Sequence, residues 1–202
     1  MAKPVIALDI DDVLVDSVTG IFDDYNEKYG TALTKEHYYS KDIEVLGVSD
    51  YKVAAERFEK YLASDAYASL VPISDAIRAI RRLSGQYAFV AVTSRPMFVE
   101  SMTRRWIKEH FEGMIQDVVF THFVMAADTS NHPSISSKVD ACRRIGAMFM
   151  VEDHLHHVIP VAESGVKVFL LDQPWNQQAK LPSNVSRVKS WDVIEKALLK
   201  EV

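Results

Sequence analysis

The chain has 202 residues, of which 48% are hydrophobic and 25% are charged, and its formal net charge is −5 at pH 7. This composition is typical of a globular protein, and the length fits one core domain with a small insertion. A mildly acidic chain is a poor partner for a nucleic-acid polymer, although a small anionic ligand can still bind at a local cationic site.

The cysteine content and the apolar runs bear on where the protein works. The chain has one cysteine, Cys142, so it forms no internal disulfide, and we expect this residue to be buried on a helix. No apolar run approaches the roughly 18 residues of a membrane span, and no signal peptide is predicted. These features favour a cytoplasmic protein that does not bind a membrane. They give no indication of its oligomeric state.

Short apolar runs predict strands that are buried on both faces, as in a parallel sheet. They cover residues 5–8, 88–92, 118–120, 147–151 and 166–171. Segments with helical periodicity lie between the runs or after them, at residues 75–83, 97–111, 137–145 and 190–199. Strands that alternate with helices predict an α/β fold with a doubly wound parallel sheet.

The segment 17–73 interrupts this alternation. It contains no strand-like run, it is rich in Tyr, Glu, Lys and Asp, and it includes a helical stretch at residues 50–62. It is also longer than a connection between two strands requires. We therefore expect residues 17–73 to form a small helical cap inserted after the first strand. Residues 1–16 and 74–202 would then form the core domain.

Polar and charged residues follow the predicted strands, at the edge where open parallel sheets bind ligands. The first strand is followed by Asp9, Asp11 and Asp12, whose carboxylates repel one another unless a hard cation neutralises them. An isolated Asp-x-Asp pair often lies in a solvated turn, but here a buried strand precedes it and apolar residues 13–15 follow. The other candidates at this edge are Thr93, Ser94, Arg95, Lys138, Glu152 and Asp153.

In their order along the chain, these residues resemble the motifs of the haloacid-dehalogenase-like (HAD) superfamily. The matching residues are Asp9-x-Asp11-x-Val13-Leu14, Thr93, Lys138 and Glu152-Asp153. The resemblance covers the whole predicted core. It implies a Rossmann-type core domain and a Mg²⁺-dependent phosphatase that acts on a small phosphorylated metabolite.

The resemblance also implies the role of each acidic residue. Asp9 would attack phosphorus and form an aspartyl-phosphate, while Asp11 would act first as general acid and then as general base. Asp9, the backbone carbonyl of Asp11, and Asp153 would bind Mg²⁺, with Glu152 as a further ligand, directly or through water. The order of Glu152 and Asp153 in the metal site stays open.

The basic and hydroxyl residues would hold the phosphoryl group. Thr93 would offer its hydroxyl, Ser94 its backbone N–H and Lys138 a fixed positive charge. The alternatives are a β-branched strand end for Thr93 and an exposed helix lysine for Lys138. Arg95 either contacts the substrate or has an exposed structural role.

Two later stretches narrow the resemblance to the cytosolic 5′-nucleotidases that act on deoxyribonucleotides, and to their bacterial relatives. They are Asp172-Gln173-Pro174-Trp175-Asn176, which ends a longer matching run from Val168, and Val188-Lys-Ser-Trp191-Asp192. The resemblance implies a preference for nucleoside monophosphates, the deoxy forms in particular. Two positions depart from it, since those nucleotidases often have Gly in place of Asp12 and Asp in place of Glu152.

Further residues have alternative interpretations. His154, His156 and His157 bind zinc, lie on the rim of the site, or lie on a solvated helix start. The cap tyrosines either stack on a base or form the core of the cap; they are Tyr25, Tyr38, Tyr39 and Tyr51. Asp16 is expected to solvate the start of the cap.

Other functions remain open beside a nucleotidase. The chain could be a phosphatase of a different metabolite, such as a sugar phosphate, or a phosphomutase or kinase-like transferase. A hydrolytic dehalogenase would not need the acid at Asp11, and a non-catalytic phospho-ligand-binding module would not need Asp9, Asp11 and Lys138 together.

Overall fold

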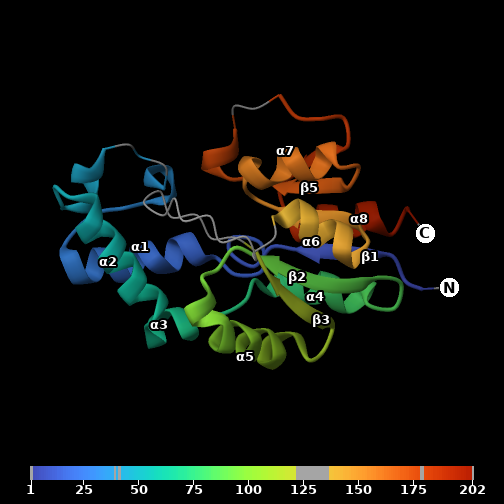
Figure 1. The fold of residues 1–202 in the computed structure, drawn as a ribbon, viewed down its shortest axis with the longest axis horizontal. Coiled ribbons are helices and arrows are strands. Elements are labelled where there is room, and N and C mark those ends of the chain that lie inside the picture. The colour runs from blue at the N-terminus through green and yellow to red at the C-terminus, as the bar shows by residue number, and fades with distance from the viewer. Residues whose placement is uncertain (1, 39, 41, 122–136, 178–179, 202) are drawn as a thin grey trace.

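The fold was analysed in a computed structural model that describes residues 2–38, 40, 42–121, 137–177 and 180–201 (Figure 1). The described strands form one sheet of six in the order β3-β2-β1-β4-β5-β6, and every neighbouring pair is parallel. The strands are β1 (Val5–Leu8), β2 (Ala88–Thr93), β3 (Ile115–Phe120), β4 (Ala147–Glu152), β5 (Lys167–Leu171) and β6 (Val185–Val188). The predicted α/β fold with a doubly wound parallel sheet is confirmed.

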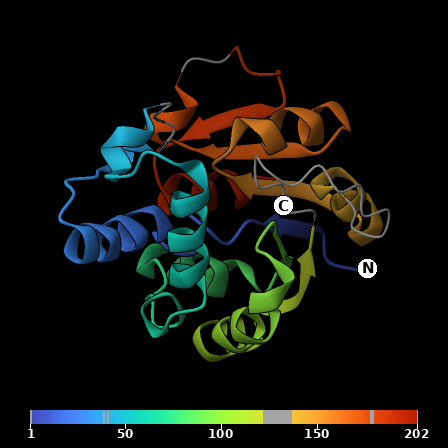
Figure 2. The ribbon, with the colours of Figure 1, turned by 60° about the vertical axis from the view of Figure 1, so that its left-hand side comes forward.

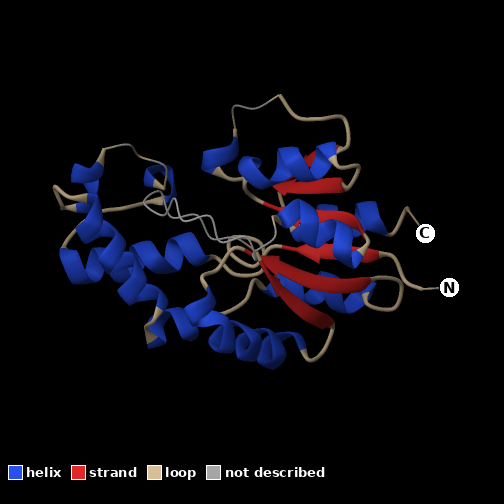
Figure 3. Ribbon diagram, viewed as in Figure 1, coloured by secondary structure: helices blue, strands red, loops and turns tan. Residues whose placement is uncertain are grey.

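The strands are buried on both faces because helices cover both sides of the sheet (Figure 3). In β1, Ile6 and Leu8 pack into one apolar cluster and Ala7 packs into the other. The first cluster includes residues of α4 (Ser74–Leu83), α5 (Glu100–Phe111) and α8 (Trp191–Leu198). The second includes residues of α6 (Lys138–Ile145) and α7 (Leu155–Glu163). Because side chains alternate along a strand, a run of consecutive apolar residues is needed to fill both clusters.

Most elements lie where the sequence predicts them, with one strand added. Cys142 is buried on α6, as expected. The strand missed by sequence reasoning is β6, a short edge strand in which only Val188 is buried. A half-exposed edge strand needs no continuous apolar run, so it lacks the signal that identifies the central strands.

Residues 17–73 contain helices and no strand among the described positions. The helices are α1 (Ser17–Tyr29), η1 (Lys35–His37), η2 (Ile43–Leu46), α2 (Tyr51–Leu62) and α3 (Asp65–Ala68). Figures 1 and 2 show them together, beside the sheet edge that faces away from the N-terminus. We call them the helical unit. Tyr61, Leu62 and Tyr67 pack against Val99 of η3 (Met97–Val99), so the unit is anchored to the residues that follow β2.

None of the described helices combines the length and the apolar character that a membrane span requires.

Candidate active site

Three carboxylates meet where β1 and β4 end. These strands are neighbours in register, with Leu8 opposite Val151, and the backbone N–H of Asp9 donates to the carbonyl of Val151 at 3.0 Å. The pairing therefore brings Asp9 beside Glu152 and Asp153. One carboxylate oxygen from each of the three residues lies within 4.8 Å of those of the other two.

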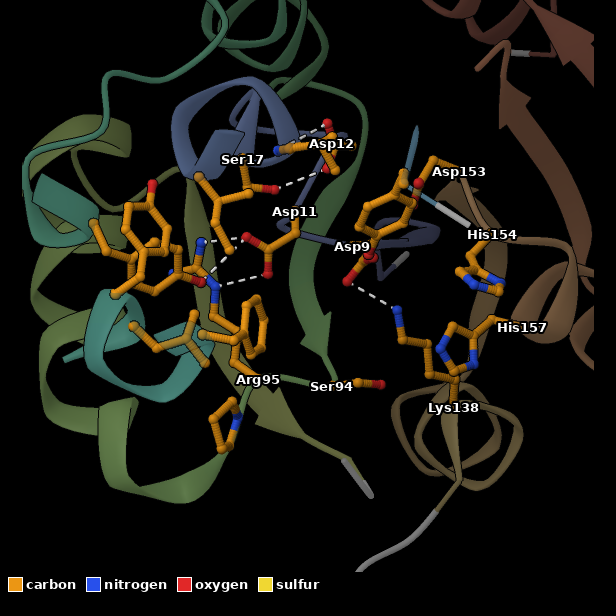
Figure 4. A pocket seen from close by; sticks show the side chains of 18 residues that line it. Asp9, Asp11, Asp12, Ser17, Ser94, Arg95, Lys138, Asp153, His154 and His157 are labelled. Carbon is orange, nitrogen blue, oxygen red and sulfur yellow. Dashed lines mark hydrogen bonds and ion pairs between the residues drawn. The ribbon is translucent and has the colours of Figure 1, made fainter. Parts of the chain in front are cut away.

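Lys138 extends from the first turn of α6 into this cluster. Ser137 caps the helix, since its hydroxyl accepts from the N–H of Asp140 at 3.2 Å, and the helix therefore begins at Lys138. The Lys138 ammonium lies 2.8 Å from Asp9 Oδ1 (Figure 4). It also lies 2.6 Å from Glu152 Oε1, and its side chain is only 2% exposed. Lysine is rarely buried unless it is paired, so its position here is determined by the two carboxylates.

Glu152 and Asp153 differ in how many of their oxygens are engaged. Glu152 Oε1 binds Lys138, while Oε2 accepts from the backbone N–H groups of Asp153 and His154, each at 2.6 Å. Asp153 accepts one side-chain hydrogen bond, at Oδ2, from Trp175 Nε1 at 2.8 Å. Among the described residues, Asp153 Oδ1 has no hydrogen-bond donor. Asp153 can therefore offer an oxygen to a cation, whereas both oxygens of Glu152 are already engaged.

The cluster holds more negative charge than Lys138 can balance. Burial raises the pKa of Asp9 to about 7; Lys138 opposes this shift and Glu152 adds to it. Burial, followed by the charges of Glu152 and Asp9, also raises the pKa of Asp153 well above its ordinary value. A divalent cation would relieve this repulsion, and a site made of carboxylate oxygens suits Mg²⁺.

Asp11 faces away from this cluster, toward Arg95. Arg95 holds the Asp11 carboxylate with two hydrogen bonds, Nε to Oδ2 at 2.8 Å and Nη2 to Oδ1 at 2.7 Å (Figure 4). Tyr67 of α3 also donates to Oδ1, at 3.3 Å. Burial alone would raise the pKa of Asp11, but the charge and hydrogen bonds of Arg95 outweigh it, so the pKa is lowered.

Arg95 is itself buried and supported on several sides. Its Nη1 donates to Thr103 Oγ1 at 3.2 Å, and its guanidinium carbon lies 4.7 Å from the centre of the Tyr67 ring. The side chain is 5% exposed. The structure therefore places Arg95 inside the site, in contact with Asp11.

Asp12 occupies a position where the backbone is left-handed. Its φ is +55°, a conformation that glycine adopts easily and that aspartate tolerates better than most residues. Its carboxylate accepts from the Ser17 hydroxyl at 2.8 Å, at the start of α1. Asp16 caps the same helix by accepting from the N–H of Thr19 at 3.3 Å. Asp12 thus adopts a backbone conformation that favours Gly, and its bond to Ser17 ties the start of α1 to the turn after β1.

Thr93 and Ser94, at the end of β2, differ in access to the site. Thr93 is fully buried, and its hydroxyl accepts from the N–H of Arg95 at 3.1 Å. Ser94 lines the cavity, with its hydroxyl 3.0 Å from that of Thr121. Ser94 therefore reaches the cavity directly, while the Thr93 side chain shapes the turn that carries Arg95.

Two adjoining cavities lie at this edge of the sheet. The first has a volume of about 170 Å³ and contains most of the charged side chains described above. Its lining includes Asp9, Asp11, Ser94, Arg95, Lys138 and Asp153. The second, of about 700 Å³, is lined by residues of the helical unit and is mainly apolar. Ile21, Tyr38 and Phe58 line both cavities, so the two adjoin.

The histidines do not form a metal site in the described residues. The one group of candidate ligands there consists of Asp9, Glu152 and Asp153 and contains no histidine. His154 instead caps α7, since its Nδ1 accepts from the N–H of His156 at 3.1 Å. The alternative of a helix start at the rim of the site fits this arrangement.

The tyrosines of the helical unit have different surroundings. Tyr25 is buried and donates to the carbonyl of Leu46 at 2.8 Å, so it belongs to the core of the helical unit, although its ring also borders the larger cavity. Tyr38 and Tyr51 line that cavity, and Tyr39 lies outside the described residues.

Sequence reasoning did not identify two residues that contact the site. Tyr67 carries no recognisable signal, because its contact with Asp11 comes from a separate helix. Trp175 lies in the stretch 172–176, which stands out in the sequence only for its resemblance to the deoxyribonucleotidase family. That resemblance marks the stretch as part of the family pattern, but it does not specify the hydrogen bond between Trp175 and Asp153.

Comparison with known proteins shows that the sequence matches a family of nucleotidases. The family described as 5′ nucleotidase, deoxy (Pyrimidine), cytosolic type C protein matches residues 3–129, which include Asp9, Asp11 and Thr93. The chain belongs to this family. It is a phosphatase of the HAD superfamily, as the sequence resemblance implied.

One curated relative extends the likeness beyond the residues matched by the family. An uncharacterised 32.4 kDa protein of Enterobacteria phage T4, from the Gp30–rIII intergenic region, is 24% identical over 203 residues. The match covers 97% of this chain and 70% of the phage protein.

Solved structures show the same fold at low sequence identity. The HAD-like hydrolase SP0104 from Streptococcus pneumoniae has a TM-score of 0.64 at 14% identity, with 98% of each chain covered. YfnB from Bacillus subtilis, assigned to the HAD hydrolases and bound to magnesium, has a TM-score of 0.61 at 12% identity, with 98% of this chain and 99% of YfnB covered. A HAD family hydrolase from Deinococcus radiodurans with bound phosphate and sodium has a TM-score of 0.62 at 15% identity, covering 98% and 96%.

Proposed function

We propose that this phosphatase is a Mg²⁺-dependent 5′-nucleotidase that works through an aspartyl-phosphate on Asp9. The observation that carries the proposal is the shared cavity in which Asp9, paired with Lys138 at 2.8 Å, lies together with Asp11 and Asp153. A nucleophile, a fixed cation, an acid–base group and a metal ligand thus face one space. Phosphoryl transfer requires this combination of positioning and charge neutralisation.

The carboxylates of Asp9 and Asp153 and the backbone carbonyl of Asp11 would hold the metal ion. Glu152 has three donors on its two oxygens, so we assign it to anchoring Lys138 and to contact with the ion through water. When bound, Mg²⁺ supplies charge that shields Asp9 from the anionic phosphate and polarises the phosphoryl oxygens. The magnesium-bound relative YfnB supports this choice of metal.

Asp9 would attack phosphorus, forming a new P–O bond while the bond to the ester oxygen breaks. Asp11 would give its proton to the leaving alkoxide and then take a proton from the water that cleaves the aspartyl-phosphate. In the present arrangement the Asp11 carboxylate is engaged with Arg95. Its side chain would therefore leave Arg95 and turn toward Asp9 within the shared cavity, where it would take up a proton from solvent before it acts as an acid.

The phosphoryl group would be held by the Lys138 ammonium and the backbone N–H of Ser94. Lys138 is rigidly placed, since it contacts two carboxylates, and such pre-oriented charge contributes most to electrostatic catalysis. We assign Thr93 to the same phosphate-binding turn. The phosphate-bound hydrolase of Deinococcus radiodurans, which has the same fold, supports phosphate as a ligand of this site.

The substrate would extend from the core into the helical unit, which we propose is a cap at residues 17–73 on a core of residues 1–16 and 74–202. The catalytic cavity, at about 170 Å³, is smaller than a typical ligand site, whereas the adjoining cavity, at about 700 Å³, is within the usual range. Aromatic residues such as Tyr38 and Phe58 line both, and an aromatic ring can stack on a base. Together with the family match, this favours nucleoside monophosphates, the deoxy forms in particular. The name of that family also supports a cytoplasmic location.

Phosphate release from a panel of phosphomonoesters tests the proposal. The panel would contain matched deoxynucleotides, ribonucleotides, sugar phosphates and phosphoamino acids, each assayed with Mg²⁺ and after exhaustive chelation. We expect activity only with the metal and the highest kcat/KM on deoxynucleoside monophosphates. Full activity after chelation would reject the metal-dependent mechanism. A sugar phosphate preferred by more than about tenfold, or ~1.4 kcal/mol, would reject the nucleotidase assignment and leave the phosphatase.

A further inference from the structure

The stretch 172–176 lies against the candidate metal site, although it lines neither cavity. Its 3-10 helix η4 (Pro174–Asn176) brings the indole of Trp175 beside Asp153. The Nε1–H of Trp175 donates to Asp153 Oδ2 at 2.8 Å, and no other described side chain donates to this carboxylate. Trp175 therefore contacts a candidate metal ligand without facing the substrate.

The backbone around Trp175 is fixed by buried hydrogen bonds. Asn176 is fully buried, and its Nδ2 donates to the carbonyls of Asp153 at 2.7 Å and Leu171 at 2.8 Å. Arg187 of β6 donates to both the side chain and the carbonyl of Asn176. One side-chain amide thus links the turn after β4 to the end of β5, so Trp175 and Asp153 are held at a set distance.

The indole is also in contact with the helical unit. The ring of Tyr38, directly after η1, lies 4.8 Å from the ring of Trp175 between centres. Lys35 of η1 lies 6.0 Å from the centre of the same indole, and its ammonium also pairs with Asp16 at 2.9 Å. The indole therefore contacts both Asp153 and residues of the helical unit.

We propose that Trp175 is a positioning residue that orients Asp153 for the metal ion. An aspartate side chain can rotate and present either oxygen. A donor fixed on Oδ2 favours one rotamer and leaves Oδ1 available to the ion. This inference rests on the proposed function, since it takes Asp153 as a ligand of Mg²⁺. It assigns the tryptophan of the 172–176 stretch to the metal site and not to the nucleotide.

Direct metal binding, measured without substrate, tests the role. Mn²⁺ would serve as the probe, with free Mn²⁺ followed by electron paramagnetic resonance and Mg²⁺ added as a competitor. Trp175→Phe keeps a ring against Tyr38 but removes the N–H donor. We expect its affinity for Mn²⁺ to fall about 10–100-fold, the range found when a hydrogen-bond partner of a metal ligand is removed.

Two further variants separate positioning from folding. Trp106→Phe is the matched control: it also removes an indole donor, from the 2.6 Å bond to the carbonyl of Leu70, but not from a candidate metal ligand. It should bind Mn²⁺ like the wild type even if its melting temperature falls. Trp175→His keeps a five-membered ring whose Nε2–H can replace the indole N–H, and it should recover part of the lost affinity.

The outcomes distinguish this inference from the proposed function. If the wild type binds no Mn²⁺, the metal-dependent function itself fails. If the wild type binds Mn²⁺ and Trp175→Phe binds it equally well, only the positioning role is overturned. Equal loss of affinity in Trp175→Phe and Trp106→Phe, each with a lowered melting temperature, would also overturn it, because the effect would then be one of general stability.

Discussion

Asp9 and Asp11 are separated by one residue, yet their carboxylates lie in opposite environments on two sides of one cavity (Figure 4). Asp9 faces the core, where Lys138 is outnumbered by carboxylates, and its pKa is raised to about 7. Asp11 faces Arg95, which follows β2, and Tyr67 of the helical unit; both donate to it, and its pKa is lowered. The charge of an aspartate is thus set by the elements it faces and not by its place in a motif.

The difference also suggests why the two carboxylates have different tasks. The Asp9 side has an excess of negative charge, and in the proposed mechanism a bound cation would leave Asp9 ionised as a nucleophile. The Asp11 side has a cation of its own, Arg95, and its contacts come partly from α3, from which Tyr67 donates to Asp11. In the proposed mechanism, Asp11 would exchange Arg95 for the substrate.

Removal of the nucleophile should have the largest effect. Asp9→Asn retains the shape of the side chain but replaces the attacking oxygen pair with an amide. We expect turnover to fall on the order of 10⁶-fold, as when a covalent nucleophile is lost in other enzymes. Phosphate release by protein freed of contaminating phosphatases measures this. Undiminished hydrolysis would rule out Asp9 as the nucleophile.

Replacing Asp11 with Asn, on the other side of the cavity, should reduce turnover less, by an amount that depends on the leaving group of the substrate. Asp11→Asn should lower turnover about 10²–10⁴-fold for an alkyl phosphate, because its alkoxide needs a proton. An aryl phosphate has a better leaving group and should lose less in the first step. Rapid quenching with labelled substrate would then reveal phosphorylated protein that hydrolyses slowly. Equal losses for both substrates, with no trapped phosphoprotein, would contradict an acid–base role.

The two buried cations, Lys138 and Arg95, can be compared by how much each contributes to the free energy of unfolding. Lys138→Met and Arg95→Met each keep an unbranched apolar chain and remove the charge. Without metal, Lys138→Met should lower the free energy of unfolding by about 3–5 kcal/mol, because it leaves Asp9 and Glu152 buried and unpaired. Arg95→Met should cost less, since the Asp11 side chain is 33% exposed and can be solvated. Urea denaturation measures both.

Added Mg²⁺ should change the stability of these two variants by different amounts. Mg²⁺ should restore part of the stability lost in Lys138→Met, because it replaces the missing positive charge beside Asp9, and little of that lost in Arg95→Met. Equal recovery in the two variants would show that the ion does not bind on the Asp9 side.

The pH dependence of stability should change the free energy of unfolding of the metal-free protein by about 4 kcal/mol, because each unit of pKa shift corresponds to about 1.4 kcal/mol. The pKa of Asp9 rises from 3.8 to about 7 on folding, so its contribution is full below about pH 4 and is lost as the pH rises through 7. Asp11 acts in the opposite direction. Its lowered pKa gives stability that is present above 3.8 and is lost as the pH falls below that value.

Denaturation at a series of pH values in chelator would test these signs. Asp9→Asn should weaken the decline toward neutral pH, but not abolish it, because burial also raises the pKa of Asp12 to about 7. Saturating Mg²⁺ should flatten the decline by binding ionised Asp9. A decline that is unchanged in Asp9→Asn would locate the titrating group elsewhere.

Local patterns were sufficient to predict the framework of the protein. The apolar runs of β1, β2, β4 and β5 identify strands because a strand covered on both faces must be apolar throughout. Parallel strands end at the same edge of a sheet, so residues as distant as Asp9 and Asp153 could be placed in one site from sequence alone. The positions of Asp9, Lys138 and Asp153 around one cavity follow from this rule.

The direction in which each side chain points was decided only by tertiary structure. Asp11 meets Arg95 across 84 positions of the chain and Tyr67 across 56, and Asp153 meets Trp175 across 22. Hydrogen bonds depend on fractions of an ångström and on angle, and no sequence spacing specifies these for residues on separate elements. The same limit applies to Glu152 and Asp153: two adjacent carboxylates look alike in sequence, and the donors around each of them determine which one keeps an oxygen for the metal.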